Sequence, residues 1–272
     1  MSVAFITGAG RGQGRAHAVT LARLGHDIVA FDAPQGLTTL PYETASEEDL
    51  EQTCKLVRET GRRAIAVAGD VRRTADIERA VAAATGELGG LDVAIANAGI
   101  CSFARFDDIT DEQWEEMQAV NLGGVFRTLR AALPTMRAQG SGRLLATSSM
   151  AGRGGSPNIA HYAAMKAGVI SLVKTLALEL GESGITVNCL CPTTTDTPMV
   201  HNRPMYGLFA PDIADPTPES VRHRYAAMNP MRVAWLDPQE IADVAAFLVS
   251  DAGRHISGAV FEVSAGGSGS QL

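Results

Sequence analysis

The sequence predicts a single-domain α/β fold built on a doubly wound, parallel, seven-stranded sheet with helices on both faces. Short apolar runs alternate with longer helical segments over 272 residues, a length that suits one large domain. The expected strands are apolar along their whole length, which is typical of a parallel sheet buried on both faces. Seven such strands in one order favour an open doubly wound sheet over a closed barrel.

The first half of the chain supplies four strands and three helices. The first strand leads into a glycine-rich turn, and the second ends at Asp32. Each helix is followed by a glycine that favours its termination, at Gly25, Gly61 and Gly89. We expect strands at residues 3–7, 27–31, 64–68 and 91–96, and helices at residues 13–24, 47–59 and 75–88.

The second half continues the alternation with longer helices. One helix is expected over residues 111–136, with Pro134 near its end, and another over residues 161–180, ended by Gly181. The last helix is expected over residues 238–250. The remaining strands are expected at residues 143–147, 185–190 and 259–263.

Two connections are longer than an ordinary turn. Residues 33–46 separate the second strand from its helix, and residues 192–237, rich in proline, methionine and asparagine, follow the sixth strand. Connections of this length inside a domain are usually functional or contain helices of their own. We therefore expect one domain over residues 1–272, with an inserted flap at about 33–46 and a substrate lid at about 193–237, both covering a ligand crevice.

The composition excludes several classes of partner. The net charge is −7, with both signs mixed along the chain and no basic tract, so we expect no nucleic acid partner. No apolar run approaches the length that crosses a bilayer, so we expect no membrane partner. The N-terminus enters an apolar strand without a signal-peptide pattern, and the expected compartment is the cytoplasm.

The four cysteines do not predict a metal site. Cys54, Cys101, Cys189 and Cys191 are scattered, without paired CxxC spacing or a histidine cluster beside them. We expect reduced and mostly buried thiols. Cys189 and Cys191 lie two residues apart on or just after a strand, so their side chains point the same way.

The turn TGAGRGQG, residues 7–14, has the context of a phosphate-binding loop. It follows a strand and opens a helix, and its glycines let the backbone approach a pyrophosphate closely. The helix N-terminus then offers free N–H groups to an anion. Its spacing is GxxxGxG, and the alternative is a tight turn without a ligand. The candidate cofactor-binding residues here are Gly8, Arg11, Gly12, Gln13 and Gly14.

Asp32 indicates which dinucleotide is bound. It lies 18 residues after Gly14, at the end of the second strand, where a carboxylate can accept hydrogen bonds from both adenosine-ribose hydroxyls. The same charge would repel a 2′-phosphate, so NAD is favoured over NADP. Arg11 favours the opposite choice, because a base in the turn could meet that phosphate. We give Asp32 more weight, since it would contact the discriminating atom directly.

A tyrosine and a lysine one helical turn apart form the second signal. In the run Tyr162-Ala-Ala-Met-Lys166, positions i and i+4 share one face of a helix. A free tyrosine is a poor base at neutral pH, and a nearby cation lowers its pKa by stabilising the phenolate. Such a pair also occurs on ordinary packed helices, so it needs support from other residues.

Polar residues at the expected carboxyl ends of strands give that support. Ser148 and Ser149 follow the fifth strand, and Ser149 lies 13 residues before Tyr162. The tripeptide Asn97-Ala98-Gly99 follows the fourth strand, although alone it is an ordinary turn. Asn121 lies within a helix, where asparagine is a mediocre helix former, and a satisfied buried amide is the alternative for it.

Together these residues resemble the short-chain dehydrogenase/reductase family, which has a Rossmann-type fold. The motifs that carry the resemblance are TGAGRGQG (7–14), DV (70–71), NAG (97–99), Asn121, Ser149, YAAMK (162–166) and the segment from Pro192 to Thr197. They cover nearly the whole chain in the family's order. One departure is Thr193, where many members carry glycine, which puts the local loop shape in question.

The resemblance implies a catalytic tetrad of Asn121, Ser149, Tyr162 and Lys166. Tyr162 exchanges a proton with the substrate oxygen, Ser149 orients that oxygen, and Lys166 binds the nicotinamide ribose and lowers the tyrosine pKa. Asn121 supports a water-linked proton relay to Lys166. The resemblance adds further cofactor-binding residues, namely Asp70, Val71, Asn97, Ala98, Gly99, Tyr162, Lys166, Pro192 and Thr197.

The chain is most similar to the mycofactocin-dependent, carveol dehydrogenase-like members of that family. The signs are GRGQGRAHAV (10–19), YETASEEDLEQT (42–53), PTTTDTPM (192–199) and MNPMRVAWLDPQEIADVAAFL (228–248). The resemblance implies tightly bound, non-exchanging NAD(H) that is reoxidised in place by an external mycofactocin electron acceptor. It also implies a homotetramer, formed through the helices of Asn121 and Tyr162 and the last strand.

The expected activity is the interconversion of a secondary alcohol and a ketone by hydride transfer. An apolar, methionine-containing lid suggests a terpenoid- or steroid-like substrate, although ordinary lid packing explains it equally well. One alternative is a 3-oxoacyl thioester reductase with freely exchanging NAD(P)H. Another is a dinucleotide-sensing protein without catalysis.

Overall fold

One parallel sheet organises the chain, which the computed structural model describes over residues 2–32 and 37–270. Its strand order is β3-β2-β1-β4-β5-β6-β7, and every neighbouring pair is parallel. This confirms the predicted fold class. The strands are β1 (Ser2–Thr7), β2 (His26–Asp32), β3 (Ala64–Ala68), β4 (Val93–Ala96), β5 (Gly142–Thr147), β6 (Ile185–Pro192) and β7 (Val260–Val263).

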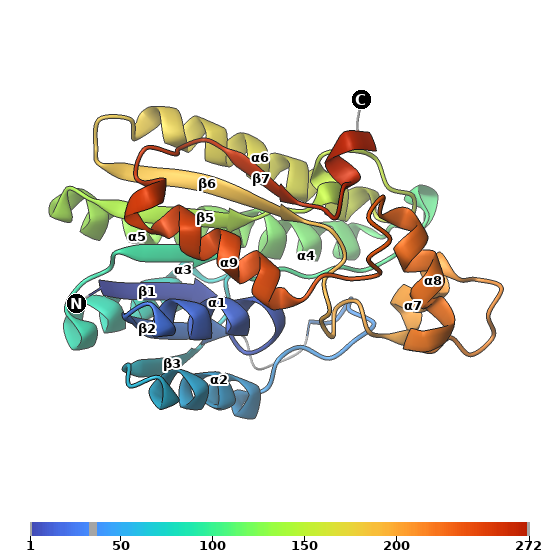
Figure 1. Cartoon of the computed structure of the whole chain (residues 1–272), viewed down its shortest axis with the longest axis horizontal. Coiled ribbons are helices and arrows are strands. Elements are labelled where there is room, and N and C mark those ends of the chain that lie inside the picture. Colours follow the sequence, from blue (N-terminus) through green and yellow to red (C-terminus); the bar gives the residue numbers. More distant parts are fainter. Residues whose placement is uncertain (1, 33–36, 271–272) are drawn as a thin grey trace.

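Helices cover both faces of the sheet, as Figure 1 shows with α1 and α9 in front and α4 and α5 behind. Apolar residues of α3, α4, α5 and α6 pack in one core, and those of α1, α2 and α9 pack in the other. The bounds are α1 (Gly12–Arg23), α2 (Glu47–Glu59), α3 (Thr74–Ala83), α4 (Asp111–Asn121), α5 (Gly123–Gln139), α6 (Ala160–Glu179), α7 (Arg203–Phe209), α8 (Pro218–Met228) and α9 (Pro238–Val249).

The pleat of β1 shows why one strand serves both cores. Val3 and Phe5 belong to the core beneath α3 to α6, whereas Ala4 and Ile6 belong to the core beneath α1, α2 and α9. Successive side chains of a strand point to opposite faces, so a strand buried on both sides must be apolar throughout. This explains the continuous apolar runs in the sequence.

The strand order places a crevice at one edge of the sheet. β1 pairs with β2 on one side and with β4 on the other, so the chain reverses its direction of winding there. Open α/β sheets bind ligands at such a switch point, outside the carboxyl ends of the strands. The residues that follow β1, β4, β5 and β6 therefore meet at one place.

The prediction of a single helix over residues 111–136 was wrong, because the helix is interrupted at Leu122 and the chain forms two helices, α4 and α5. Leu122 has φ −108° and ψ −50°, and it serves as the C-cap of α4 and the N-cap of α5. Asn121 lies at the bend, where its buried amide bonds both backbone groups of Ile100 at 2.8 Å. At Gly124 a Cβ would lie 2.8 Å from Val71, so α5 packs closely on the neighbouring loop.

The helix predicted over residues 75–88 also changes character. Regular α-helix ends at Ala83, and residues Ala84–Leu88 continue as one π-helical turn. Gly89 then takes a left-handed conformation with φ 95°, as expected for a glycine that ends a helix. Short 3-10 turns occur at Phe106–Asp108, Met150–Gly152, Asp251–Gly253 and Gly267–Ser270.

The long segment after β6 contains helices α7 and α8, which Figure 1 shows together at one end of the sheet. A third apolar cluster holds them, in which Tyr225 is fully buried. Its ring centroid lies 4.9 Å from that of Phe209 and 5.8 Å from that of Trp235. The segment is therefore a packed unit, and we refer to residues 193–237 as the lid.

The predicted flap falls only partly on the described residues. Residues 33–36 lie outside them, and we use the name flap below for residues 37–46. Its last residue, Ser46, begins α2 with a reciprocal capping box to Asp49. Over the described ranges, no helix combines the length and the apolar character needed to span a bilayer.

Replacement of Gly14 by alanine is expected to destabilise the fold, because the new Cβ would lie 2.0 Å from the carbonyl oxygen of Gly8. We expect Gly14→Ala to lower the free energy of unfolding by about 3 kcal/mol, the upper range for overpacking. Gly86→Ala is the matched control, because nothing lies within 4 Å of the added Cβ. Urea denaturation of both variants checks this, and equal stabilities would contradict the close approach at Gly14.

Candidate active site

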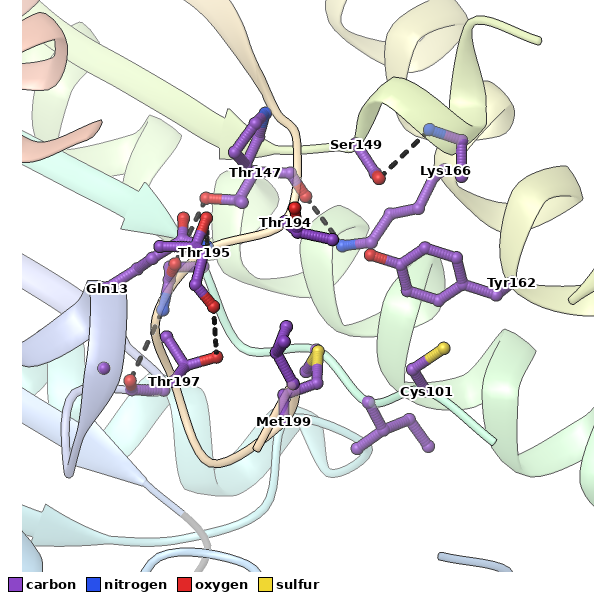
Figure 2. A pocket seen from close by; sticks show the side chains of 18 of the residues that line it. Gln13, Cys101, Thr147, Ser149, Tyr162, Lys166, Thr194, Thr195, Thr197 and Met199 are labelled. Carbon is purple, nitrogen blue, oxygen red and sulfur yellow. Dashed lines mark hydrogen bonds between the residues drawn. The ribbon is translucent and has the colours of Figure 1, made fainter. Parts of the chain in front are cut away.

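A cavity of about 530 Å³ lies at the carboxyl ends of β1, β4, β5 and β6. Its volume is within the range of small-molecule sites. Figure 2 shows residues from the turn, from α6 and from the lid pointing into it. The predicted site residues that line it are Gly8, Arg11, Gly12, Gln13, Asp32, Asp70, Val71, Asn97, Ala98, Gly99, Ser149, Tyr162, Lys166, Pro192 and Thr197.

The glycine-rich turn has the backbone shape that the sequence predicted. Gly8 and Gly12 have φ values of +69° and +53°, which L side chains rarely adopt. A Cβ at Gly8 would also lie 2.8 Å from Cα of Ala98. Gly14 does not line the cavity, and its role is to let α1 pack against the carbonyl of Gly8.

The outer side of the turn is held by two residues that the sequence did not single out. Thr53 Oγ1, from α2, lies 2.9 Å from the carbonyl oxygen of Ala9 and 3.1 Å from that of Gly10. The Arg15 guanidinium bonds Thr53 Oγ1 at 2.9 Å and also the carbonyl of Gly10. No local spacing marks this set, because Thr53 is 38 residues from Arg15 in the sequence.

The N-terminus of α1 faces the cavity without a side-chain cap. Among the described residues, the N-cap Arg11 makes no side-chain hydrogen bond to the first turn of α1. Its guanidinium instead donates to the carbonyl of Glu43 in the flap. The first amides of a helix carry a partial positive charge, so they can bind an anionic group.

Asp32 lies at the end of β2, beside the turn. Its Oδ2 accepts a hydrogen bond from the Gly10 amide at 2.8 Å. A Cβ at Gly10 would lie 2.8 Å from that same oxygen and 2.7 Å from Cβ of Ala45. The carboxylate therefore sits where the turn, the second strand and the flap meet.

Asp70 and Val71 line the same part of the cavity, after β3. The Asp70 carboxylate accepts from the Arg72 amide and from Arg72 Nε, both at 2.8 Å. Val71 packs against α5 at Gly124. The carboxylate is thus engaged by the protein, and Val71 presents an apolar surface.

Asn97 ties three strand ends together. Its Nδ2 donates to the carbonyls of Thr7 and Gly8 at 3.1 and 3.3 Å, and its Oδ1 accepts from Thr147 Oγ1 at 3.3 Å. Thr7 Oγ1 in turn accepts from the amides of Asn97 and Ala98, each at 3.1 Å. Asn97 therefore positions the cavity wall as well as lining it.

Ser149, Tyr162 and Lys166 converge at the other end of the cavity. Lys166 Nζ lies 5.6 Å from the ring centroid of Tyr162 and donates to the carbonyl of Thr147 at 2.8 Å. Ser149 Oγ accepts from the Ala151 amide at 3.1 Å. Figure 2 shows the Tyr162 hydroxyl next to the Lys166 ammonium, with Ser149 above them.

Burial changes the acidity of both α6 residues. Burial raises the pKa of Tyr162 well above its ordinary value, and the Ser149 side chain opposes that rise. Burial lowers the pKa of Lys166 to about 8, against the opposing influence of Cys189, Cys191 and Cys101. That Lys166 lowers the pKa of Tyr162 when a nicotinamide is bound therefore stays a prediction.

Asn121 lies outside the cavity lining, beneath Gly99. A Cβ at Gly99 would lie 3.0 Å from Asn121 Oδ1 and 3.2 Å from Lys166 Nζ, so this glycine permits their close approach. The Asn121 side chain is engaged by Ile100, as described above. Its part in a proton relay therefore stays a prediction.

The start of the lid closes the cavity over the turn. Pro192 ends β6, and Thr197 Cγ2 would lie 3.0 Å from a Cβ at Gly12. Gln13 Nε2 donates to Thr195 Oγ1 at 3.4 Å. Thr193, the departure from the family pattern, donates through Oγ1 to Asn229 Oδ1 at 3.1 Å and so joins the two ends of the lid.

Tyr42 and Cys101 are among the cavity residues that the sequence did not mark as site candidates. Tyr42, in the flap, accepts a hydrogen bond from the Cys101 amide at 2.9 Å, and both residues line the cavity. Burial raises the pKa of Tyr42, and it raises that of the Cys101 thiol to about 12. All four cysteines are free and buried, as expected. Only the three-dimensional path of the flap reveals the Tyr42 contact.

The residues present fit a bound dinucleotide. The glycine turn leaves a cradle that Cβ atoms would fill, and the uncapped end of α1 opens onto it. Among the described residues, the buried Gln13 Oε1 has no hydrogen-bond partner, although Gln13 lines the cavity. A buried acceptor of this kind calls for a ligand or water to satisfy it.

Comparisons with known proteins show the family to which the chain belongs. A family model described as short chain dehydrogenase matches residues 2–205. The chain is 40% identical over 270 residues to (-)-trans-carveol dehydrogenase of Rhodococcus erythropolis, covering 97% of this chain and 96% of that protein.

Solved structures give the same result. Carveol dehydrogenase from Mycobacterium avium in complex with NAD has a TM-score of 0.96 at 39% identity, covering 98% of this chain and 97% of the other. A short chain dehydrogenase from Mycobacterium paratuberculosis bound to NAD has a TM-score of 0.90 at 34% identity, covering 98% of both chains. The protein is therefore an oxidoreductase that belongs to the short-chain dehydrogenase family, similar to carveol dehydrogenases.

Proposed function

We propose that this protein interconverts a secondary alcohol and a ketone with NAD(H) as the hydride carrier. The observation that carries the proposal is one continuous cavity with a dinucleotide cradle at one end and Ser149, Tyr162 and Lys166 at the other. Two relatives of nearly full length have been solved with NAD. When bound, the nicotinamide would supply or accept the hydride.

Tyr162 is the proposed proton-transfer residue. As a buried neutral phenol it can donate a proton to a developing alkoxide during ketone reduction, and it must lose that proton for alcohol oxidation. Ser149 lines the same cavity and can hold the substrate oxygen beside Tyr162. Lys166, charged below a pKa of about 8, stabilises the phenolate form. Asn121 is proposed to support the relay behind Lys166.

The proposed cofactor is NAD rather than NADP. Asp32 would accept hydrogen bonds from the adenosine-ribose hydroxyls and repel a 2′-phosphate. Arg11, which could have favoured the phosphate, bonds the flap backbone at Glu43. Gly8, Gly12 and the uncapped α1 would hold the pyrophosphate, and Asp70 and Val71 would flank the adenine.

We propose further that NAD(H) is held tightly and is reoxidised in place by an external acceptor such as mycofactocin. The flap supports this, because Leu37, Tyr42, Thr44 and Ala45 line the cavity and cover its adenosine side. Burial of a ligand under an ordered cover slows its dissociation.

The proposed substrate is apolar and terpenoid- or steroid-like. Next to the proton-transfer residues the lid contributes an apolar wall, and the relatives named above include carveol dehydrogenases. The lid residues of the wall are Met199, Val200, Met205, Leu208, Phe209 and Met228, and Phe103 joins them from the segment after β4.

A homotetramer is proposed from the exposed apolar side chains of α4, α5 and α6. Trp114, Phe126 and Leu178 are 40%, 43% and 87% exposed, which is unusual for large apolar side chains on packed helices. Pairing of these helices between copies would cover them.

Tyr162→Phe is expected to lower turnover of secondary alcohols by at least about 100-fold, because general acid–base catalysis is lost. Bound NAD(H) should remain, since the cradle is untouched. Tyr225→Phe is the control, because the Tyr225 hydroxyl bonds Met205 in the lid core. A screen of secondary alcohols with an artificial electron acceptor measures turnover, and wild-type activity of Tyr162→Phe would remove the proton-transfer assignment.

Asp32→Asn is expected to weaken NAD binding by about tenfold and to reduce the preference for NAD over NADP, because hydrogen bonds to a charged group are lost. Calorimetric titration of protein stripped of dinucleotide measures both affinities. An unchanged ratio of the NAD and NADP dissociation constants would show that Asp32 does not discriminate between the two dinucleotides.

Lys166→Met is expected to reveal the cost of burying an ammonium. The pKa of Lys166 is about 8 in the folded protein and 10.5 in the unfolded chain, so the lysine is charged in both states at neutral pH. Burying that charge lowers the free energy of unfolding, and the loss is greatest below pH 8. This penalty is relieved as pH rises from about 8 towards 10.5. The stability of Lys166→Met relative to the wild type should therefore fall by on the order of 2 kcal/mol between pH 7 and pH 10.

Denaturant titrations at the two pH values check this prediction. Lys174→Met is the matched control, because Lys174 is exposed on the same helix. If both variants followed the same pH trend, burial of Lys166 would not be its source.

A further inference from the structure

Glu116 is a buried carboxylate that the proposed reaction does not use. It lies on α4, is 8% exposed, and does not line the cavity. A carboxylate in such a place requires compensating hydrogen bonds. These bonds come from the flap.

The flap donates to both oxygens of Glu116. The Thr38 amide donates to Oε1 at 3.3 Å, and the Thr39 amide donates to Oε2 at 3.0 Å. The Thr39 hydroxyl also donates to Oε2. Hydrogen bonds to an ionised acceptor are stronger than neutral ones, and here they are partly buried.

Glu116 is also connected to the wall of the dinucleotide site. Arg72 Nη1 lies 3.4 Å from Glu116 Oε1, and Arg72 Nη2 lies 2.7 Å from Asp70 Oδ2. Asp70 lines the cavity where the adenine is proposed to bind. One network of hydrogen bonds and ion pairs therefore joins the flap, α4 and this wall.

The other part of the flap is attached to the opposite walls. Tyr42 accepts from the Cys101 amide after β4, and Glu43 accepts from Arg11 in the turn. Flap residues on either side of these contacts, Leu37, Tyr42, Thr44 and Ala45, line the cavity. The flap thus spans the cavity, and a ligand lying beneath it leaves only when one set of contacts breaks.

We infer that Glu116 is a latch that holds the flap closed and sets the rate at which the dinucleotide dissociates. This inference rests on the proposed function, since it assumes that NAD(H) lies beneath the flap. Opening the flap would remove the Thr38 and Thr39 donors and leave the buried carboxylate, among the described residues, with Arg72 alone, so the open state is disfavoured. Glu116 is a positioning residue, and the chemical step does not depend on it.

The test compares Glu116→Gln with Glu115→Gln in the full-length protein. Glu115 is exposed on the same helix, so both variants lose one negative charge from α4. Each protein is loaded with isotopically labelled NAD and chased with excess unlabelled NAD, and retained label is followed by mass spectrometry. We expect Glu116→Gln to release NAD at least about tenfold faster than the wild type. Glu115→Gln should release NAD at the wild-type rate and keep the wild-type thermal stability. Turnover of the loaded enzyme should be unchanged in both variants.

Thr39→Ala provides a second route that leaves α4 intact. It removes one donor to Glu116 from the flap side, so faster release is expected here even if Glu116→Gln does not fold. Wild-type release rates in both variants, or in Thr39→Ala alone if the other is unfolded, would overturn the latch. Rapid release from the wild type would instead contradict the proposed tight retention, and the ratio of variant to wild-type rates would still test Glu116.

Discussion

The close approach of backbone to backbone at the end of β1 is the constraint on which the site depends. Gly14 packs against the carbonyl of Gly8, and Gly8 packs against Ala98, with no room for a Cβ at either glycine. Because α1 can therefore begin directly above the sheet, its uncapped amides open onto the switch point between β1 and β4. Asn97 fixes the same place from the other side by joining three strand ends.

At the opposite end of the cavity, burial controls the protonation of Lys166 and Tyr162. Lys166 is held in a largely apolar surrounding by its bond to Thr147, and the same burial favours the neutral forms of Lys166 and Tyr162. A site of this kind costs stability, which the two large cores on either face of the sheet offset. Charge that develops during a reaction is stabilised more strongly here than in water.

The two long insertions cover different halves of one cavity. The lid contributes an apolar wall beside Tyr162 and is itself held by the aromatic cluster around Tyr225. The flap lines the cavity through Leu37, Tyr42, Thr44 and Ala45, and polar and charged contacts hold it to α4, to the segment after β4 and to the turn. Apolar packing can adapt to varied substrates, whereas directional hydrogen bonds favour one closed arrangement over one ligand.

The sequence by itself determined the parallel sheet, its strand positions and a set of candidate residues most of which line one cavity, because apolar runs, glycines and the Tyr162–Lys166 spacing are local properties of the chain. Only the tertiary structure decided the bend at Leu122, the side-chain partners of Asn121, and the parts played by Thr53, Tyr42 and Glu116. These depend on contacts between residues 21 to 77 positions apart, for which no periodic signal exists. The direction in which the pKa of Tyr162 shifts was likewise beyond the sequence, because its main cause, burial, is a property of the folded surroundings.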